Sequence, residues 1–375
     1  MKAAVIDIGS GSIKAGFGGQ DSPKVMFPSV IGKPRHDGIM PAIMGGKEVY
    51  IGEDAIENRG VLRLTHPIEA GSISDWEGFE LLLHHTFYDE LMVPPHDAPL
   101  LLTETPQNDK KKREKLTEIL FETLGIPSLL LQSQPILALA GTGLTSGVVV
   151  DSGAGSTHIV PIYQGYAIDH GVEFYPVNGS DITNFLISLL RERGYDFRTS
   201  RGIDIVCKMK EELCYVHPHA VKDISYDHLS AEEFAEYNYK LPDGQEIVLS
   251  RELPRATEAL FFPSLIGKDH PSLGSVIFNS IVKCDVDIRN DLFNNIVLCG
   301  GNTLFKGFAS RLRTEVDKSI DKGPKIHVNV IDTPEREYSV WLGGSILTRL
   351  TTFDSMVMTA KEYDEQGVSI VHTLL

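Results

Sequence analysis

Two short segments of this chain combine aspartate, glycine and serine in the same order. Residues 7–12 read D-I-G-S-G-S, and residues 151–156 read D-S-G-A-G-S. A turn built from glycine and serine can aim several backbone N–H groups at one point, which is what a phosphate group requires. The glycines remove the Cβ atoms that would prevent close approach, and each aspartate places a carboxylate beside the turn. This pattern is typical of a phosphate-binding loop that works with a divalent cation.

The repetition separates this pattern from an ordinary hairpin turn, which is the commoner explanation for a single copy. Two copies in register predict one nucleotide site served by both turns. Asp7 and Asp151 would bring two carboxylates to one Mg²⁺, largely through waters, because Mg²⁺ keeps several waters and binds few carboxylates directly. Lys14, which follows the first turn, would supply a cation for the β and γ phosphate oxygens.

A third glycine segment and a glycine pair each have a plain structural alternative. Residues 296–303, I-V-L-C-G-G-N-T, indicate a strand, a tight turn and then a helical pattern over 308–316. This segment fits either a simple strand-to-helix connection or a loop that holds the nucleoside. Residues 343–345, G-G-S, are predicted to form a turn before another helix and to act as a hinge.

The elements that must position these residues are alternating strands and helices. Each Asp-Gly turn follows an apolar β-prone run, at residues 3–6 or 148–150, and leads into a second β-prone stretch. Helical patterns cover residues 76–91, 111–124, 134–140, 180–193 and 201–215. A repeat at this spacing, far longer than that of a solenoid, predicts two α/β domains of common ancestry.

Two segments rich in turn formers interrupt the duplicated plan. We expect a first large domain from residues 1–29, 66–141 and 338–375, with residues 30–65 as a small inserted subdomain. We expect a second large domain from residues 142–178 and 259–337, with residues 179–258 inserted. Pro242-Asp243-Gly244 marks a turn between β-prone runs of the second insertion.

Composition narrows the classes of function. The chain has 375 residues, 42% of them hydrophobic, and a formal net charge of −16, which disfavours binding to nucleic acids. No apolar run approaches the roughly 20 residues needed to cross a bilayer, so we expect no membrane partner. The four cysteines form no C-x-x-C pair, which favours a reducing cytoplasm over a disulfide framework or a zinc site.

Many further peptides of this sequence resemble those of the actin family, along nearly the whole chain and in the family order. They include residues 7–17 (D-I-G-S-G-S-I-K-A-G-F), 27–29 (F-P-S), 84–88 (H-H-T-F-Y), 101–104 (L-L-T-E), 210–215 (K-E-E-L-C-Y), 241–244 (L-P-D-G), 283–289 (K-C-D-V-D-I-R) and 338–341 (Y-S-V-W). The resemblance implies a two-domain actin-like ATPase fold, in which duplicated ribonuclease-H-like domains carry two small inserted subdomains.

The resemblance also implies roles for individual residues. Gln134 would orient the attacking water and His158 would relay or accept its proton, although outside this context they would be taken for a helix-surface amide and a hydrogen-bonded core histidine. ATP or ADP would bind with Mg²⁺, or alternatively Ca²⁺. The implied nucleotide contacts are Ser10, Gly11, Ser12, Lys14, Gly153, Gly155, Ser156, Thr157, Gly179, Lys210, Glu211, Gly300, Gly301, Leu304 and Phe305.

Polymerisation is the second property that the resemblance implies. The loop over residues 36–47 matches the family's subunit-contacting loop and carries four flexible apolar residues, Ile39, Met40, Ile43 and Met44. The family's receiving groove matches Tyr163, Tyr166, Leu350 and Phe353. Because loop and groove are different surfaces, copies of the chain would join head-to-tail into an open filament. A hairpin folded back on its own domain is the plain alternative for the loop.

Several positions depart from the family. Ala154 stands where actins place another aspartate, a difference that concerns metal affinity or hydrolysis rate. Glu337 and Cys207 replace basic residues near the adenosine, a difference that concerns nucleotide preference. Phe174 replaces an arginine that works with an asparagine, here Asn108, to gate phosphate release; core packing is its alternative role. Ala70 replaces a commonly methylated histidine, one of the differences that argue against a myosin track.

Three functions remain as hypotheses from this sequence. The leading one is a cytoplasmic, slowly ATP-hydrolysing cytoskeletal protein, whose regulators would resemble profilin or gelsolin. The second is an ATP-binding actin-related subunit of a regulatory complex that does not polymerise alone. The third is a monomeric kinase or chaperone ATPase on the same fold, which the actin-specific peptide at residues 283–289 argues against.

Overall fold

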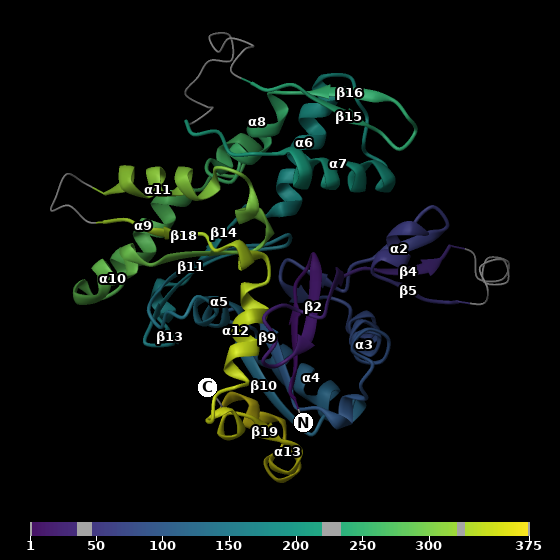
Figure 1. The fold of residues 1–375 in the computed structure, drawn as a ribbon, viewed down its shortest axis with the longest axis vertical. Helices are drawn as coiled ribbons and strands as arrows, with labels where there is room; N and C mark the ends of the chain where they lie inside the picture. Colours follow the sequence, from purple (N-terminus) through teal and green to yellow (C-terminus); the bar gives the residue numbers. More distant parts are fainter. Residues whose placement is uncertain (1, 36–46, 220–233, 321–326, 374–375) are drawn as a thin grey trace. The chain divides into compact units, whose positions relative to one another are not determined.

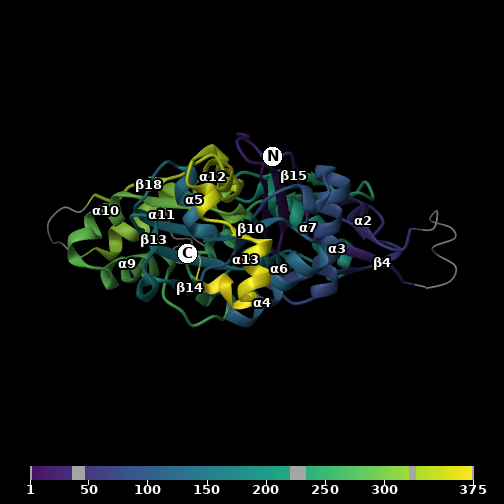
Figure 2. The same cartoon turned by 90° about the horizontal axis from the view of Figure 1, so that it is seen from below.

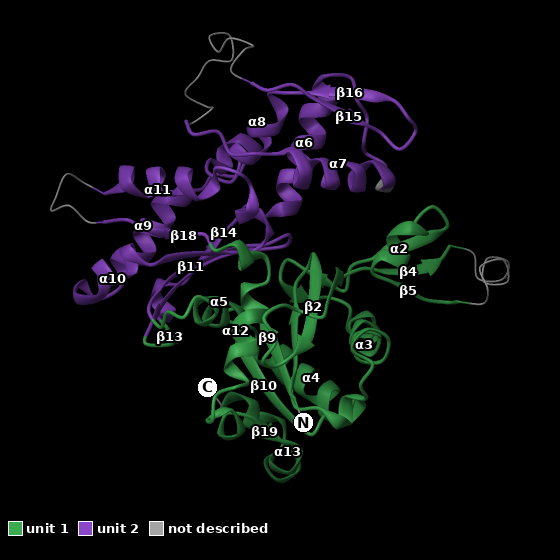
Figure 3. Ribbon diagram, in the orientation of Figure 1, with its two compact units in different colours: residues 1–145, 164–167, 333–375 green, residues 146–163, 168–332 purple. Residues whose placement is uncertain are grey.

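The chain divides into two compact units. The computed structural model describes residues 2–35, 47–219, 234–320 and 327–373. Unit 1 comprises residues 1–145, 164–167 and 333–375, and unit 2 comprises residues 146–163 and 168–332 (Figure 3). The four-part division expected from the sequence is finer than this one and remains a prediction. Each unit is described by itself below.

Unit 1 is built on a six-stranded mixed sheet in the order β19-β10-β9-β1-β2-β3 (Figure 1). Its strands are β1 (Ala4–Ile8), β2 (Ser12–Phe17), β3 (Val25–Pro28), β9 (Leu100–Glu104), β10 (Ser128–Ser133) and β19 (Met358–Thr359). β1 pairs antiparallel with β2 and parallel with β9, which in turn pairs parallel with β10. The first four residues of both β1 and β9 are buried, as expected for central strands covered on both faces.

Five α-helices accompany this sheet: α3 (Trp76–His85), α4 (Lys110–Glu118), α5 (Gln134–Gly141), α12 (Ser339–Leu347) and α13 (Ala360–Gln366). α3 begins at Asp75 and α4 at Asp109, whose carboxylates accept the otherwise unpaired N–H groups of each first turn. Both helices continue as π-helical turns, Thr86–Leu91 and Ile119–Thr123. The helices predicted over 76–91 and 111–124 are therefore present, with a change of winding that the periodicity did not reveal.

The C-terminal segment of unit 1 packs against α4 and the π-helical turn that follows it (Figure 2). The Tyr363 ring stacks on Phe121 at 4.7 Å between centroids, and its hydroxyl donates to Glu122 Oε1 at 2.8 Å. His372 Nε2 lies 3.0 Å from Glu114 Oε1 on α4. These contacts join the C-terminal segment of unit 1 to its N-terminal segment.

The glycine pair at 343–344 lies inside α12, so the turn predicted there is wrong, whereas the hinge stays a prediction. A Cβ on Gly343 would lie 1.8 Å from the Leu137 carbonyl oxygen of α5, and a Cβ on Gly344 would lie 2.9 Å from Val5 Cγ1. Both glycines are needed because α12 packs with its backbone against α5 and β1. The Trp341 indole N–H also donates to the Val5 carbonyl at 2.9 Å.

Residues 30–65 contain a small separate sheet. It has the order β5-β4-β6, with β4 (Ile31–Pro34), β5 (Tyr50–Ile51) and β6 (Leu62–Thr65), and helix α2 (Glu53–Glu57) follows β5. Val30, Tyr50, Ala55 and Leu62 form its core. A further ribbon of β7 (Ile68–Glu69) and β8 (Ser72–Ile73) follows. The proposed assembly residues Ile39, Met40, Ile43 and Met44 lie outside the described residues.

Unit 2 repeats the strand plan of unit 1. β12 (Thr157–Tyr163), β11 (Gly147–Ser152), β17 (Ile296–Cys299) and β18 (Val330–Ile331) are neighbours in that order, and β14 (Glu173–Tyr175) pairs with β12. β11 pairs antiparallel with β12 and parallel with β17, as β1 does with β2 and β9. This shared plan, with the Asp-Gly turn after the central strand, confirms the prediction of duplicated α/β units.

The remaining elements of unit 2 surround its own apolar core, which takes residues from β11, α6, α9 and α11. They are α6 (Gly179–Glu192), α7 (Ser200–Leu213), α8 (Glu252–Glu258), α9 (Leu273–Lys283), α10 (Arg289–Asn294), α11 (Phe308–Ser319) and the hairpin of β15 (Tyr237–Lys240) and β16 (Glu246–Leu249). Gly244 closes that hairpin with a φ of +90°, as the turn signal predicted. Within the described ranges, none of the helices has the length and apolarity needed to span a membrane.

Candidate functional site

The first Asp-Gly turn is held in shape by hydrogen bonds to its own carbonyl groups. The Gly9 N–H donates to the Ser12 carbonyl at 3.1 Å, which closes the turn. Ser29 then secures both glycines, because its hydroxyl donates to the Gly9 carbonyl at 2.6 Å and its N–H donates to the Gly11 carbonyl at 3.2 Å. The Ser10 hydroxyl accepts from the Gly71 N–H at 3.0 Å. No role was predicted for Ser29, which lies 17 residues beyond Ser12.

Asp7 is a buried carboxylate at the centre of the unit 1 site, with 4% of its surface exposed. Its Oδ1 accepts hydrogen bonds from the Thr103 hydroxyl at 2.8 Å and from Gln134 Nε2 at 3.1 Å. Its Oδ2 lies 3.8 Å from Lys14 Nζ, since Asp7 and Lys14 face each other across the β1–β2 ladder. The structure therefore brings Lys14 and Gln134, two other predicted site residues, to the Asp7 carboxylate.

Gln134 is buried, which excludes the helix-surface alternative. It is the first residue of α5, and its Nε2 lies within 3.4 Å of the Ile8 carbonyl and of Thr103 Oγ1, in addition to Asp7. These acceptors fix the amide nitrogen, so the amide oxygen is the atom that can accept a hydrogen bond from a water. Thr103 was missed by the sequence reasoning, although the β1–β9 register places it next to Asp7.

The second turn has the same closing bond. The Gly153 N–H donates to the Ser156 carbonyl at 2.9 Å, the counterpart of Gly9 and Ser12. The start of α6 then holds the turn from outside, because the N–H of Gly179 donates to the Gly153 carbonyl at 3.0 Å and that of Ser180 to the Ala154 carbonyl at 3.0 Å. Asn178 Nδ2 donates to the Gly155 carbonyl at 3.0 Å.

The third glycine segment is joined to the second turn. Gly300 has a φ of +85°, and a Cβ there would lie 2.4 Å from the Ser152 carbonyl oxygen and 2.8 Å from Asp151 Oδ1, so only glycine fits. Asn302 Nδ2 donates to Ser152 Oγ at 3.0 Å and to the Gly153 carbonyl at 2.8 Å. This contact joins the segment to the second turn, and its role as a ligand loop stays a prediction. Gly301 and Leu304 are exposed beside it, and Phe305 is buried.

Lys210 and Glu211 have different surroundings although they are adjacent on α7. Lys210 is buried, and its Nζ donates to the Gly179 carbonyl at 3.2 Å, next to the second turn. The ordinary solvated-face alternative is therefore wrong for Lys210, whereas Glu211 is exposed. One turn earlier, Cys207 Sγ lies 3.6 Å from Thr183 Oγ1, and burial raises the pKa of this thiol.

His158 is buried opposite Asp151 in the β11–β12 ladder. Its Nδ1 has no hydrogen-bond partner in the part of the chain that the structure describes, so the hydrogen-bonded core alternative does not hold. Burial lowers the pKa of His158 to about 4, which keeps the ring neutral at pH 7. The Phe174 ring stands edge-on to it at 5.1 Å, and Phe174 is 53% exposed, so core packing is wrong for Phe174.

The other predicted residues have more ordinary surroundings. The Thr157 hydroxyl donates to the Val177 carbonyl at 2.6 Å, so it supports the second turn from within the unit. Of the proposed groove, Tyr166 and Leu350 are exposed, Tyr163 is half-buried and Phe353 is buried at 6% exposure. No group of three or more His, Cys, Asp or Glu side chains gathers as a metal cluster within the described residues.

Two α/β units of one strand plan, each with an Asp-Gly turn after its central strand, define an actin-like fold. Residues 1–374 match the family described as Actin, and the chain belongs to the actin family. The family has an ATPase-type fold, and its members generally bind nucleotide and divalent cations.

Proposed function

We propose that this protein binds ATP or ADP with Mg²⁺ and hydrolyses ATP slowly. The observation that carries the proposal is the repeated turn, in which the N–H of Gly9 donates to the Ser12 carbonyl and the N–H of Gly153 donates to the Ser156 carbonyl, at equivalent positions of the two copies. Both turns would contribute backbone N–H groups to the phosphates, as would the side chains of Ser10, Ser12, Ser156 and Lys14.

The buried donors and acceptors fit such a ligand. Asp7 and Asp151 would hold the cation, largely through waters, and the bound cation would neutralise charge on the phosphates. The unpartnered Nδ1 of His158 supports the presence of a water or ligand atom nearby, because a buried polar atom without a partner is costly. Gly301, Leu304, Phe305, Lys210 and Glu211 are the proposed contacts of the nucleoside.

Gln134 and His158 would act on the attacking water. The Gln134 amide nitrogen donates hydrogen bonds to Asp7 and Thr103, and these bonds hold the amide oxygen in one orientation. That oxygen would accept a hydrogen bond from the attacking water. His158, kept neutral by burial, would accept the proton or pass it on. Neither group needs to be a strong base, because phosphoryl transfer depends chiefly on positioning and charge stabilisation.

Nucleotide binding can be tested by thermal unfolding with Mg-ATP. At a free ligand concentration one hundred times the dissociation constant, binding to the folded state alone stabilises it by about 2.7 kcal/mol. We expect the native chain and the exposed-site control Asp21→Asn to show the full increase in melting temperature, and Asp7→Asn to lose most of it. An unchanged shift in folded Asp7→Asn would show that the site is wrongly assigned.

Hydrolysis is tested separately with Gln134→Ala. The loss of the positioned amide oxygen should slow phosphate production on the order of 10–100-fold, because misplaced reactants lose rate without losing affinity. The thermal shift with Mg-ATP should stay nearly unchanged. Gln366→Ala, at an exposed position of α13, is the matched control. A Gln134→Ala variant that hydrolyses ATP at the native rate would remove this residue from the mechanism.

We further propose that the protein assembles head-to-tail into cytoskeletal filaments in the cytoplasm. Family membership and the exposed apolar side chains of Tyr166 and Leu350 support this proposal, since exposed apolar groups favour contact with a partner. A second copy of the chain is the proposed partner, with profilin- or gelsolin-like regulators. A non-polymerising actin-related subunit is the alternative, and sedimentation with Mg-ATP distinguishes the two.

A further inference from the structure

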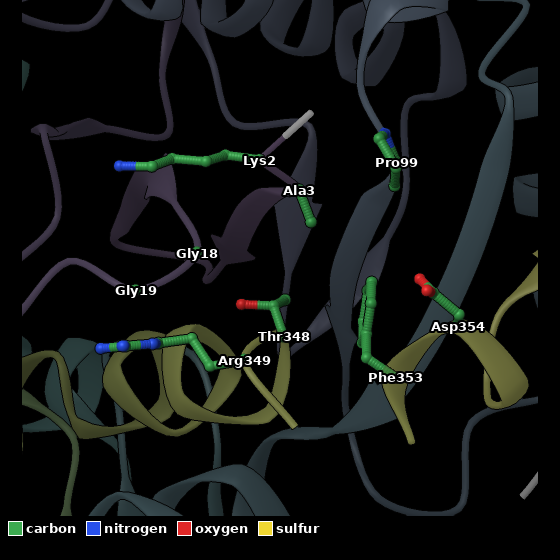
Figure 4. A pocket seen from close by; sticks show the side chains of 9 residues that line it. All are labelled: Lys2, Ala3, Gly18, Gly19, Pro99, Thr348, Arg349, Phe353 and Asp354. Atoms are coloured by element: carbon green, nitrogen blue, oxygen red, sulfur yellow. The ribbon is translucent and has the colours of Figure 1, made fainter. Parts of the chain in front are cut away.

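A cavity of about 410 Å³ opens in unit 1, away from the Asp-Gly turn (Figure 4). Its walls come from the residues before β1, the turn after β2 and the segment that follows α12. In Figure 4 the side chains of Lys2 and Arg349 extend in the same direction, past Gly19. The Phe353 ring lies in the middle of the view, and Asp354 lies on the other side of that ring.

The positive end of this cavity is unusual for so acidic a chain. The protein has 35 Lys and Arg residues against 51 Asp and Glu residues. Within the described residues, the side chains of Lys2 and Arg349 have no hydrogen-bond or ion-pair partner, and both line the same cavity. Two unpaired cations at one end of a cavity form a local site for negative charge.

The local backbone holds Arg349 in this position. A Cβ on Gly18 would lie 2.1 Å from Thr348 Oγ1, and one on Gly19 would lie 3.0 Å from Arg349 Cδ, so the two glycines allow the end of α12 to approach the turn. The Gly19 N–H donates to Ser345 Oγ at 2.9 Å. The arginine stem therefore lies along a fixed turn, which reduces the conformational entropy that its guanidinium loses on binding.

We propose that this cavity binds a short acidic segment of a partner protein. Two carboxylates of the segment would pair with Lys2 and Arg349, and its apolar atoms would cover the edge of the Phe353 ring. The volume suits several peptide atoms better than one inorganic anion, since ligand pockets are typically about 300–1,000 Å³. A long polyanion such as a nucleic acid is disfavoured by the net charge of −16.

The test uses the full chain with bound Mg-ATP and a fluorescein-labelled hexaglutamate peptide, followed by anisotropy after assembled material has been removed by centrifugation. We expect saturable binding that weakens with added salt, because exposed charge pairs are screened. Lys2→Gln and Arg349→Gln should each weaken binding about two- to fivefold, as expected for single exposed ion pairs. Lys361→Gln, at an exposed position on α13, should leave it unchanged.

Asp354→Asn tests whether charge at the cavity controls binding, because a merely structural role of this residue would not make the peptide bind more tightly. Removing this carboxylate lowers repulsion, so the peptide should bind about twofold more tightly. Binding that is equal in the native chain and in the Lys2→Gln, Arg349→Gln double variant would overturn the proposal. So would competition by millimolar inorganic phosphate at constant ionic strength, since that would identify a site for small anions. Neither outcome bears on nucleotide binding, which the thermal shift tests independently.

Discussion

At the scale of single residues, His158 combines burial, neutrality and a missing hydrogen-bond partner. The strand register places it between Asp151 on β11 and Phe174 on β14. Burial, which penalises the charged imidazolium, is the cause that lowers its pKa to about 4. A histidine in this state stays neutral at pH 7 and costs stability in acid.

The pH dependence of stability follows from that pKa. An unfolded histidine titrates near 6.5, so between about pH 6.5 and pH 4 the unfolded chain binds a proton that the folded chain does not. Stability is therefore fully present above pH 6.5 and falls by up to about 3 kcal/mol as the pH drops to 4. Denaturant unfolding should show a shallower acid loss for His158→Gln, and an unaltered one for exposed His96→Gln. Equal slopes in all three proteins would contradict the assignment.

Phe174 provides a prediction about product release. An exposed phenyl ring has neither the charge nor the donor fork with which an arginine holds phosphate or a partner amide. We expect phosphate to leave soon after cleavage in the native protein, and Phe174→Arg to lengthen that interval several-fold. The measurement times phosphate release against cleavage in assembling samples. A long native lag, or one that the arginine leaves unchanged, would show that position 174 does not control release.

At the scale of elements, the packing of α12 on α5 depends on glycine. A Cβ at Gly343 would meet the Leu137 carbonyl at 1.8 Å, a backbone atom that cannot rotate away. In an open helix the change from glycine to alanine would stabilise by about 1 kcal/mol. At Gly343 we expect the opposite sign, a loss of about 2–3 kcal/mol from overpacking. Urea unfolding should detect it, with Gly60→Ala, which has open space around it, changing stability by less than about 0.5 kcal/mol.

The sequence predicted the helices well where capping side chains mark their first residues. The helices at α6 and α7 begin within one residue of the predicted starts, because Asn178 and Thr199 cap them with side-chain acceptors. The glycine pair in α12 was misread because glycine serves both turns and close helix contacts, and only the three-dimensional neighbours distinguish them. The π-helical turns leave no separate periodicity in a short helix.

The charged and glycine residues of the candidate site were predictable from the sequence, but the residues that support them were not. Asp7, Lys14 and Gln134 meet as the sequence implied, since their types carry chemistry. Thr103 and Asn302 were missed, because threonine and asparagine are common at strand ends and in turns. Their importance follows from strand registers that bring positions about 100 and 150 residues apart into hydrogen-bond distance.

At the scale of the whole molecule, assembly can be tested on both proposed surfaces. Met40→Asp with Met44→Asp on the loop, or Leu350→Asp on the groove, would bury unpaired charge at a contact, which costs several kcal/mol. We expect each variant to stay in the supernatant with Mg-ATP while its thermal shift with the nucleotide stays native. Met92→Asp, at a 76% exposed site outside the proposed contact, is the control. Undiminished pelleting of both variants would show that other surfaces drive polymerisation.

The composition of unit 1 from both ends of the chain has a consequence for biosynthesis. The Val5 carbonyl accepts a hydrogen bond from the indole N–H of Trp341, which lies 336 residues further along the chain. Strand β10 likewise pairs with β19, near the C-terminal end. A ribosome adds roughly 5–20 residues per second, so the first strand emerges on the order of tens of seconds before its last neighbours exist. During that interval the nascent chain must carry an unfinished apolar sheet through the synthesis of all of unit 2.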